Sequence, residues 1–380
     1  MAELLEVDAD RVHEHFVEAG WTDGLPIVPP TPDRVLEMML GAGASDPDEV
    51  VGAVRERGVT VTVELAAINA VMAGCAPEHL PIVLASLAAM LDPAFNAHTA
   101  CTSTGGAALC AVVSGPMAAE VGMNAGHNVL GPGNRGNATI GRTLRLVAGN
   151  VLGARPGKLD ASSIGNPGKY TLCFAEESPP APWEPLRASL GYADEDTTVT
   201  VVPTEGPRQV ANHLNGDAEG ILRTFAATMR DPATFITGKG GQCVVVLGHE
   251  HRTALFEQGW TRRQVQEYLV EHSRVTPEQL ASGGVLIEEG TGKDVTPGSD
   301  GKLRSIASPD DVLIVCAGGA GAGWSAYLPS WAPPSHAASR AVTRRVRRPG
   351  EQLPLCGPDG CEVEFDDFDP PGRDIAGGAV

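Results

Sequence analysis

Short, continuous apolar runs constrain this chain more than any other feature. Three of them lie in the second half, at 197–203 (TTVTVVP), 242–248 (QCVVVLG) and 311–319 (DVLIVCAGG). A strand that is apolar at every position must bury both faces, which is typical of parallel strands covered by helices. We expect helices near 207–214, 217–230, 249–257, 261–272 and 276–281, and a further helix after the glycine-rich turn that follows 319. The second half therefore predicts an α/β fold with a mainly parallel sheet.

The first half mixes helices and strands. A helix is predicted over 8–20, and a second one begins after Thr31, because Pro32 suits the first turn and Gly41 marks an end. The proline-rich stretch between them excludes a regular helix. The remaining expected elements are a strand at 59–63, helices at 64–73 and 78–91, a buried strand at 106–114 and a helix at 139–152.

Residues 153–196 show no periodic element and are rich in Gly and Pro. We place a domain boundary near 190 for this reason. The prediction is a two-domain α/β chain. It has a mixed α+β domain over 1–190 with loops rich in Gly and Asn, an α/β domain over 191–345, and a polar tail over 346–380.

Acidic residues dominate the charge, since 47 Asp and Glu face 28 Lys and Arg and give a formal net charge of −19. Nucleic acids and anionic membrane surfaces need clustered Lys and Arg, so we expect neither as a partner. The first residues lack the pattern of a secretion signal, and no apolar run approaches the roughly 20 residues of a membrane span. We expect a cytoplasmic protein with mostly reduced cysteines.

Three ends of the expected parallel strands, at 203–209, 248–251 and 317–325, are candidate ligand sites, because open α/β sheets bind ligands at such ends. Two of them carry candidate ligand groups. In the segment 317–325, Gly319 and Gly321 would present backbone N–H groups to an anion at a helix start. The spacing matches no nucleotide-binding motif, and a tight turn explains the glycines equally well.

The other strand end carries His249, Glu250 and His251. The two imidazoles share a face only in an extended segment, and in a first helical turn they diverge by about 200°. The triplet can be a metal pair, a general base with its orienting acid, or the surface start of a helix, and the pattern favours the last.

His98 and Cys101 lie in a polar loop of the first half. A thiol near an imidazole is the arrangement of an activated nucleophile, because the thiolate is the form that attacks. Buried packing is the simpler explanation of a single cysteine. In the metal alternative, His98, Cys101, His249 and His251 serve as ligands, with Cys110 or Cys173 as further soft donors.

The loop 124–137 places His127 among Asn and Arg side chains before a helix, which suits a carboxylate or phosphate. Its glycines also serve plain turn formation. Farther on, Lys169 precedes the adjacent carboxyls of Glu176 and Glu177, and such neighbours tune acid–base chemistry. A solvated acidic turn is the simpler alternative there.

Cys356 and Cys361 flank a Pro-Asp-Gly turn in the tail. The turn can bring the two sulfurs close enough for a redox pair, although an accident of a flexible tail is the simpler interpretation.

Several long segments resemble a known group of proteins. They are TDGLPIVPPTPDRV, NAVMAGCAPEHLPIVLASL, LGPGNRGNATIGRTLRLVAGN and GNPGKYTLCFAEESPPAPWEPL, with looser similarity at VVVLGHEH and DVLIVCAGGAGAGWSAYLP. In these segments the chain resembles uncharacterised bacterial proteins fused to, or encoded beside, the UGSC-motif (seleno)protein domain. The resemblance implies thiol or redox chemistry on small molecules, with a UGSC-type protein as partner. This chain contains no CGSC or UGSC segment, so that chemistry would need the partner.

The sequence thus favours an enzyme of small-molecule metabolism that acts on a small anionic substrate in a cleft between the halves. Thiol-assisted cleavage or reduction of a carbon–heteroatom bond is the first expectation. The alternatives are a metal-dependent lyase or hydrolase, and a non-catalytic subunit of a UGSC-type partner. No cofactor can be named, and a homo-oligomer is expected. The expected catalytic residues are His98, Cys101, His127 and Glu176, and the expected substrate-binding residues are Asn128, Arg135, Asn137, Lys169, Gly319 and Gly321.

Overall fold

The computed structural model describes residues 5–214, 216–285 and 297–351. Within them the chain is a mixed α/β protein with two four-stranded sheets and a two-stranded one. The strand orders are β10-β5-β3-β4 in the first sheet and β6-β9-β7-β8 in the second, and β1 pairs with β2. The strands are β1 (Val50–Val54), β2 (Val59–Thr62), β3 (Ala108–Ser114), β4 (Cys173–Ala175), β5 (Thr198–Thr204), β6 (Arg208–Ala211), β7 (Cys243–Leu247), β8 (Val312–Cys316), β9 (Trp324–Pro329) and β10 (Val342–Arg345).

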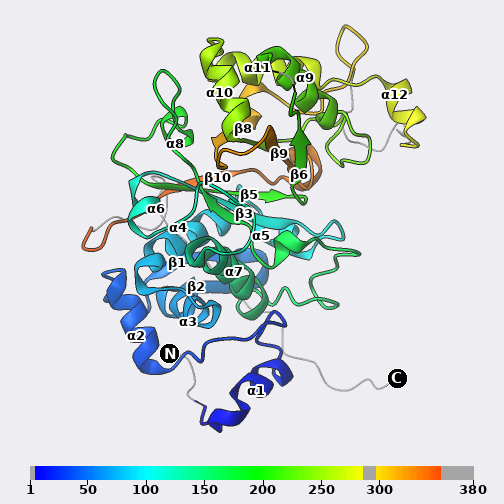
Figure 1. Cartoon of the computed structure of the whole chain (residues 1–380). Coiled ribbons are helices and arrows are strands. Elements are labelled where there is room, and N and C mark those ends of the chain that lie inside the picture. The colour runs from blue at the N-terminus through cyan, green and yellow to red at the C-terminus, as the bar shows by residue number, and fades with distance from the viewer. Residues whose placement is uncertain (1–4, 215, 286–296, 352–380) are drawn as a thin grey trace, which may run out of the picture.

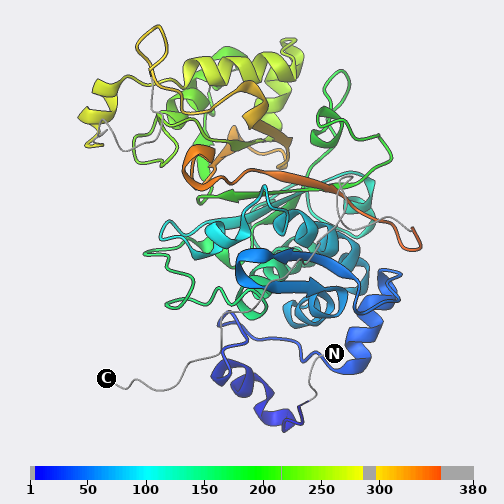
Figure 2. The ribbon, with the colours of Figure 1, turned by 180° about the vertical axis from the view of Figure 1, so that it is seen from behind.

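The two four-stranded sheets pack face to face, with helices on their outer sides, so that the molecule has four main layers (Figures 1 and 2). Alternate residues of β3 show how this works. Ala108, Cys110 and Val112 join the core between the sheets, whereas Leu109 and Val113 join the core under the helices. The second sheet contributes Val244, Val246, Leu313, Val315, Ala326 and Leu328 to the core between the sheets. Both faces of β3 are buried, which is why the strand is apolar at nearly every position.

Most helices of the first half cover the outer face of the first sheet and one another, whereas α8 lies beside β8 of the second sheet. α4 is buried along its whole length because it packs on both α7 and the strands β5 and β10. α7 instead has one buried stripe and one partly buried face. The helices of this half are α1 (Val12–Glu18), α2 (Pro32–Gly41), α3 (Val63–Ala73), α4 (Leu80–Met90), α5 (Ala97–Thr102), α6 (Pro116–Glu120), α7 (Arg135–Asn150) and α8 (Leu186–Ser189).

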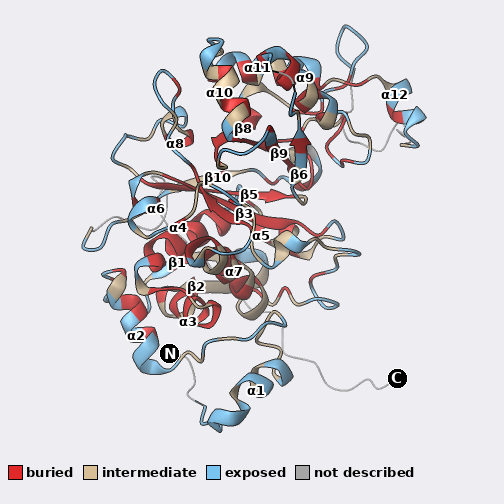
Figure 3. Cartoon of the chain, viewed as in Figure 1, coloured by how far each residue is buried: buried red, intermediate tan, exposed pale blue. Residues whose placement is uncertain are grey.

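The outer face of the second sheet is covered by helices of the second half (Figure 1). Phe225, Leu255 and Leu269 pack there against Val245 and Tyr327 of the sheet. The helices of this half are α9 (Ala218–Met229), α10 (His249–Glu257), α11 (Arg262–His272), α12 (Pro277–Ser282) and α13 (Pro334–Ala337). Figure 3 shows that the buried residues concentrate in the two sheets and on the helix sides that face them.

Most expected elements occur close to their predicted places. α2 begins at Pro32 with Thr31 in the N-cap position, and Gly74 ends α3 with a positive φ of 92°. Local capping and turn residues act over a few positions, so they can be read from sequence. The expected strands at 59–63, 106–114, 197–203, 242–248 and 311–319 correspond to β2, β3, β5, β7 and β8.

The second sheet, however, is mixed rather than mainly parallel. β7 and β8 are parallel, but β9 lies antiparallel between β7 and β6. Residues 208–211, expected in a helix, form the edge strand β6. The glycine-rich segment after β8 leads into β9 and not into a helix.

The course of this segment explains its glycines. β8 and β9 lie on opposite sides of β7, so 317–323 must cross the carboxyl end of β7. A Cβ on Gly248, at that end, would lie 1.8 Å from the Trp324 carbonyl oxygen, and one on Gly318 would lie 3.5 Å from the Gly248 Cα. Gly248 therefore permits the close crossing of the two backbones, and the glycines of 317–323 lead into β9 and precede no helix.

The first sheet crosses the expected boundary near 190. β5 and β10 lie beyond that boundary but belong to the sheet of β3 and β4, with β5 antiparallel to both β3 and β10. β4 lies within 153–196, where no element was expected, because a three-residue strand leaves no readable periodicity.

No helix in the described part of the chain is long and apolar enough to cross a membrane. The predicted pair Cys356 and Cys361, and most of the predicted tail, lie outside the described residues.

Candidate functional site

Loops from both halves meet at the carboxyl ends of the parallel strands β7 and β8, whose last residues Leu247 and Cys316 pair. The Glu177 N–H, just after β4, donates to the Cys316 carbonyl at 2.8 Å. The Gly318 N–H donates to the Ala125 carbonyl at 2.8 Å, which holds the loop 124–131 against the crossing segment. Parallel strand ends are the usual ligand sites of such sheets.

His127 lies on this junction. Its Nε2 is 2.6 Å from the Ala320 carbonyl oxygen, and a carbonyl can only accept, so Nε2 carries the proton. In the neutral ring the lone pair is then on Nδ1. A Cβ on Gly319 would lie 2.3 Å from Nδ1, so this position requires glycine for the ring to fit. The structure thus brings His127 and Gly319 together, and the imidazole is exposed to solvent.

Arg252, on α10, is a charged side chain of the junction that the sequence argument did not single out. It is 6% exposed, and its Nη2 donates to Glu177 Oε2 at 2.5 Å. Nη2 also lies 3.5 Å from His249 Nδ1, at the long limit of a hydrogen bond. Nη1 is buried and has no hydrogen-bond partner among the residues that the structure describes. A buried donor without an acceptor is costly, so Nη1 is suited to an oxygen of a ligand.

The spacing of His249 and Arg252 is the signal that could have identified this residue. Residues three apart in a helix are neighbours on one face. Once His249 is the first residue of α10, Arg252 must lie beside it.

Glu250 takes the backbone donor that was expected to bind substrate. The Gly321 N–H donates to Glu250 Oε1 at 2.7 Å. Burial acts to raise the pKa of Glu250, but this hydrogen bond and the nearby imidazoles outweigh it and lower the pKa. The crossing segment thus binds a carboxylate of the protein itself.

His251 points away from His249. Its Nδ1 is 2.7 Å from Ser325 Oγ and its Nε2 is 3.2 Å from the Asn212 carbonyl. Burial lowers the pKa of His251, which favours the neutral ring. The divergence follows from the helical start at His249. Among the described residues, no group of three or more His, Cys, Asp and Glu side chains is placed to hold a metal ion, so the proposed set of His98, Cys101, His249 and His251 does not gather.

His98 and Cys101 lie on the short helix α5. Cys101 is buried, and burial raises the pKa of its thiol to about 11 although Arg145 and Lys169 lie nearby. The thiol form therefore dominates at neutral pH, and the expected activated thiolate is not what this environment produces. Burial also raises the pKa of the other described cysteines, Cys75, Cys110, Cys173, Cys243 and Cys316.

Lys169 is near Cys101 and not at the junction. Its Nζ donates to both carboxylate oxygens of Asp160, at 2.7 and 2.9 Å, and to Ser162 Oγ at 2.6 Å. Arg145 Nη2 lies 3.1 Å from the same carboxylate, whose side chain is 3% exposed. The ammonium group is therefore the counter-charge of a buried aspartate.

Three residues of the loop 124–137 stabilise the loop and its neighbours. Arg135 donates to the carbonyls of Gly74 and Cys75 at 2.9 and 3.0 Å, just beyond the C-terminus of α3. Asn137 exchanges hydrogen bonds with the backbone of Asn124. Asn128 has a positive φ of 56°, and its Nδ2 donates to the Pro132 carbonyl at 2.7 Å.

Glu176 is enclosed beside the junction. Its carboxylate accepts from the Leu186 N–H at 2.9 and 3.0 Å, at the start of α8, and from the Ser114 hydroxyl. Its side chain is 1% exposed and lies 4.0 Å from Arg262 Nη2. Burial raises the pKa of this carboxyl despite these donors.

The predicted site residues thus separate into groups. The structure brings His127, Gly319, Gly321 and His249 to one junction, which also holds Glu177, Glu250 and Arg252. Cys101 and Lys169 form a second group around Asp160. Asn128 and Asn137 hold their own loop, and Arg135 ties it to the carbonyls beyond α3. No family model matches the chain, and no curated protein matches it either.

Proposed function

We propose that the protein is an enzyme of small-molecule metabolism that binds a small anionic substrate at the junction of β7 and β8. The observation that carries the proposal is the buried guanidinium of Arg252 with its unpartnered Nη1. A carboxylate or phosphate oxygen would satisfy this donor. Apolar side chains fill the space between the two sheets as one shared core. The substrate would therefore enter at the loops and not between the halves.

Acid–base chemistry fits this junction better than thiol chemistry. His127 has an exposed ring with the lone pair of its neutral form on Nδ1, so it is suited to remove a proton from a substrate held by Arg252. His249, beside Arg252, is suited to return the proton to a leaving group. We therefore favour a lyase or hydrolase reaction, in which bond cleavage needs one proton removed and one delivered.

The described cysteines support a reducing compartment more than a catalytic role. All six are free and buried, and burial raises each thiol pKa. Free cysteines are typical of the cytoplasm, which we propose as the location. A thiol route would have to use Cys356 or Cys361, which lie outside the described residues.

The test begins with ligand binding, because the substrate is unidentified. We expect at least one compound in a panel of small carboxylates and phosphate monoesters to raise the melting temperature of the full chain. Arg252→Ala should weaken that binding by about 100-fold, since it removes a buried, charge-assisted contact. Arg187→Ala is the matched control, because Arg187 in α8 is about as buried and its Nη1 also has no hydrogen-bond partner among the described residues.

Turnover of the bound compound, followed by NMR, then separates binding from chemistry. His127→Gln should retain binding and lose about 100-fold or more in kcat, because the amide cannot accept the proton. Equal loss of binding in Arg252→Ala and Arg187→Ala, or full turnover in His127→Gln, would contradict the proposal.

A second candidate, a subunit that works with a UGSC-type partner, rests on exposed apolar side chains. Leu159, Ile164 and Tyr170 are 42%, 94% and 52% exposed within one segment. If these side chains lie together on the surface, they form the kind of apolar patch that marks an association site. If the expected homo-oligomer forms through this segment, Ile164→Asp should lower the mass that light scattering measures for the protein alone. If a UGSC-type protein binds there, the same variant should lower the mass measured for the mixture of the two proteins. An unchanged mass in both experiments would argue against this candidate.

A further inference from the structure

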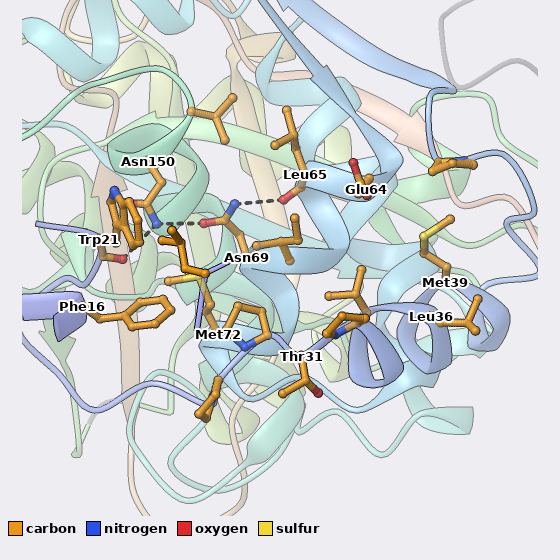
Figure 4. Close-up of a pocket in the computed structure, with 18 of the residues that line it drawn as sticks. Phe16, Trp21, Thr31, Leu36, Met39, Glu64, Leu65, Asn69, Met72 and Asn150 are labelled. Atoms are coloured by element: carbon orange, nitrogen blue, oxygen red, sulfur yellow. Dashed lines mark hydrogen bonds between the residues drawn. The ribbon is translucent and has the colours of Figure 1, made fainter. Parts of the chain in front are cut away.

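A groove of about 750 Å³ lies under residues 5–31, here called the N-terminal segment (Figure 4). It lies among helices of the first half, whereas the junction lies at strand ends of the second sheet. Its walls come from α1 and the turn after it, from α2, and from α3. Most of them are apolar or aromatic side chains, among them Phe16, Trp21, Met39, Leu65, Ile68 and Met72. Ligand sites for small molecules have volumes of about 300–1,000 Å³ and mostly apolar walls, so the groove has the size and the lining of one.

The groove is preformed, because the N-terminal segment is fastened to the helices at several points. Arg142 holds the Asp23 carboxylate with two hydrogen bonds, at 2.7 and 2.8 Å. Asn150 donates to the Trp21 carbonyl at 3.0 Å, and the Val28 N–H donates to the Met72 carbonyl at 3.2 Å. A ligand would therefore not need to order this segment when it binds.

The polar groups of the groove mostly satisfy one another. Figure 4 shows Asn150 donating to Asn69 Oδ1 and Asn69 donating to the Leu65 carbonyl, both at 2.9 Å. His15 differs, since its Nε2 is buried and has no hydrogen-bond partner within residues 5–214, 216–285 and 297–351. Its ring contacts Phe16 and Trp21 edge to face, with centroids 6.2 and 5.7 Å apart. The imidazole is thus one hydrogen-bonding group within apolar walls.

The charges of the lining indicate what kind of molecule fits. The lining residues, all within the described part of the chain, include the carboxyl of Glu64 but no Lys or Arg. An anionic head group would be desolvated there with no Lys or Arg of the lining beside it, which is costly. This separates the groove from the anion site at Arg252.

We propose that the groove binds a neutral, elongated apolar molecule, with a hydrocarbon body along the walls and one hydroxyl or carbonyl oxygen at His15 Nε2. This inference does not depend on the proposed enzymatic activity. The apolar body would displace water from the aromatic and aliphatic walls. The oxygen would supply the partner that the buried imidazole lacks.

The test uses the full chain and the neutral dye N-phenylnaphthylamine, whose fluorescence rises in apolar sites. We expect saturable binding of the dye, and displacement by decanol at a concentration about tenfold lower than by decanoate, because the ionised head group lacks a counter-charge. Absence of dye binding, or equal displacement by the alcohol and the carboxylate, would overturn the proposal.

Two leucines of α2 give matched variants. Leu36 lines the groove and is 56% exposed, whereas Leu40 lies one turn farther on, is 65% exposed and is not part of the lining. Both tolerate substitution because they are exposed. Leu36→Lys should weaken dye binding by about tenfold through the loss of apolar contact, and Leu40→Lys should leave it unchanged. Equal effects of the two variants would locate the dye elsewhere and refute the proposal.

His15→Phe tests the polar contact. It keeps an aromatic ring against Phe16 and Trp21 but removes Nε2. The affinity for decanol should fall by about fivefold or more, the size of one neutral hydrogen bond, while dye binding stays within a factor of two. An unchanged decanol affinity would rule out the contact at His15.

Discussion

At the scale of single residues, burial and pairing separate the charges that hold the fold from those open to a ligand. Lys169 and Arg145 both contact the carboxylate of Asp160, so their charges are compensated internally. Arg252 is more deeply buried than either, and one of its guanidinium nitrogens has no hydrogen-bond partner in the described part of the chain. The sequence shows a Lys or an Arg at each place, and the surrounding residues decide the role.

We expect Asp160→Asn to lower the free energy of unfolding by about 3 kcal/mol, since it leaves two buried cations without a counter-charge. Burial acts to raise the pKa of Asp160, but the hydrogen bonds from Lys169 and Ser162 outweigh it and hold the pKa below its ordinary value of 3.8. The stabilisation is therefore complete above that value and is lost as the pH falls through the lower folded-state pKa.

Urea unfolding at several pH values checks this expectation. The difference between wild type and Asp160→Asn should be largest at neutral pH and shrink as the solution becomes strongly acidic. Asp310→Asn is the control, because that side chain is 84% exposed and its ion pair should contribute little. A difference that does not change with pH would show that the lost stability comes from packing and not from charge.

At the scale of elements, the predictions succeeded where the signals are local. α10 begins at His249, and the divergence of His249 and His251 follows from the helical period alone. Two strands, β6 and β9, were missed. β6 pairs with β9, and β9 pairs with β7, so both strands depend on partners far away in the chain. Strand pairing over long sequence distances leaves little trace in the residues themselves.

Arg135 provides a test at this scale, because it was expected to bind substrate but contacts carbonyls after α3. We expect Arg135→Ala to lower the free energy of unfolding by about 1–2 kcal/mol, the value of hydrogen bonds from a charged donor. Binding of the panel compound that stabilises the wild-type chain should stay within a factor of two of wild type. Thermal unfolding and the same binding assay measure both quantities. A large loss of anion binding at unchanged stability would restore the role expected from the sequence.

At the scale of the whole molecule, the two halves share the core between the sheets. Phe174 of β4 and Val202 of β5 pack in one cluster with Val246 of β7 and Leu313 of β8. Neither sheet can lose its partner without exposing this face to water. The halves should therefore unfold together and not as two independent domains.

Phe174→Ala tests this coupling, since Phe174 is fully buried between the sheets. We expect the free energy of unfolding to fall by about 3–5 kcal/mol, and the protein should still unfold in one transition. Near-ultraviolet and far-ultraviolet circular dichroism, followed against urea concentration, should give coincident curves. Two separate transitions, of which the substitution shifts only one, would show that the halves are independent domains.

The sequence by itself determined the apolar strands, most of the helices and their ends, because burial periodicity and capping residues act within a few positions. It also indicated that glycines and histidines gather near the ends of β7 and β8. Only the tertiary structure decided that β5 and β10 join the first sheet, that the crossing segment leads into β9, and that Arg252 lies beside Glu177. These outcomes depend on contacts between residues far apart in the chain, and such contacts exist only once the layers have packed.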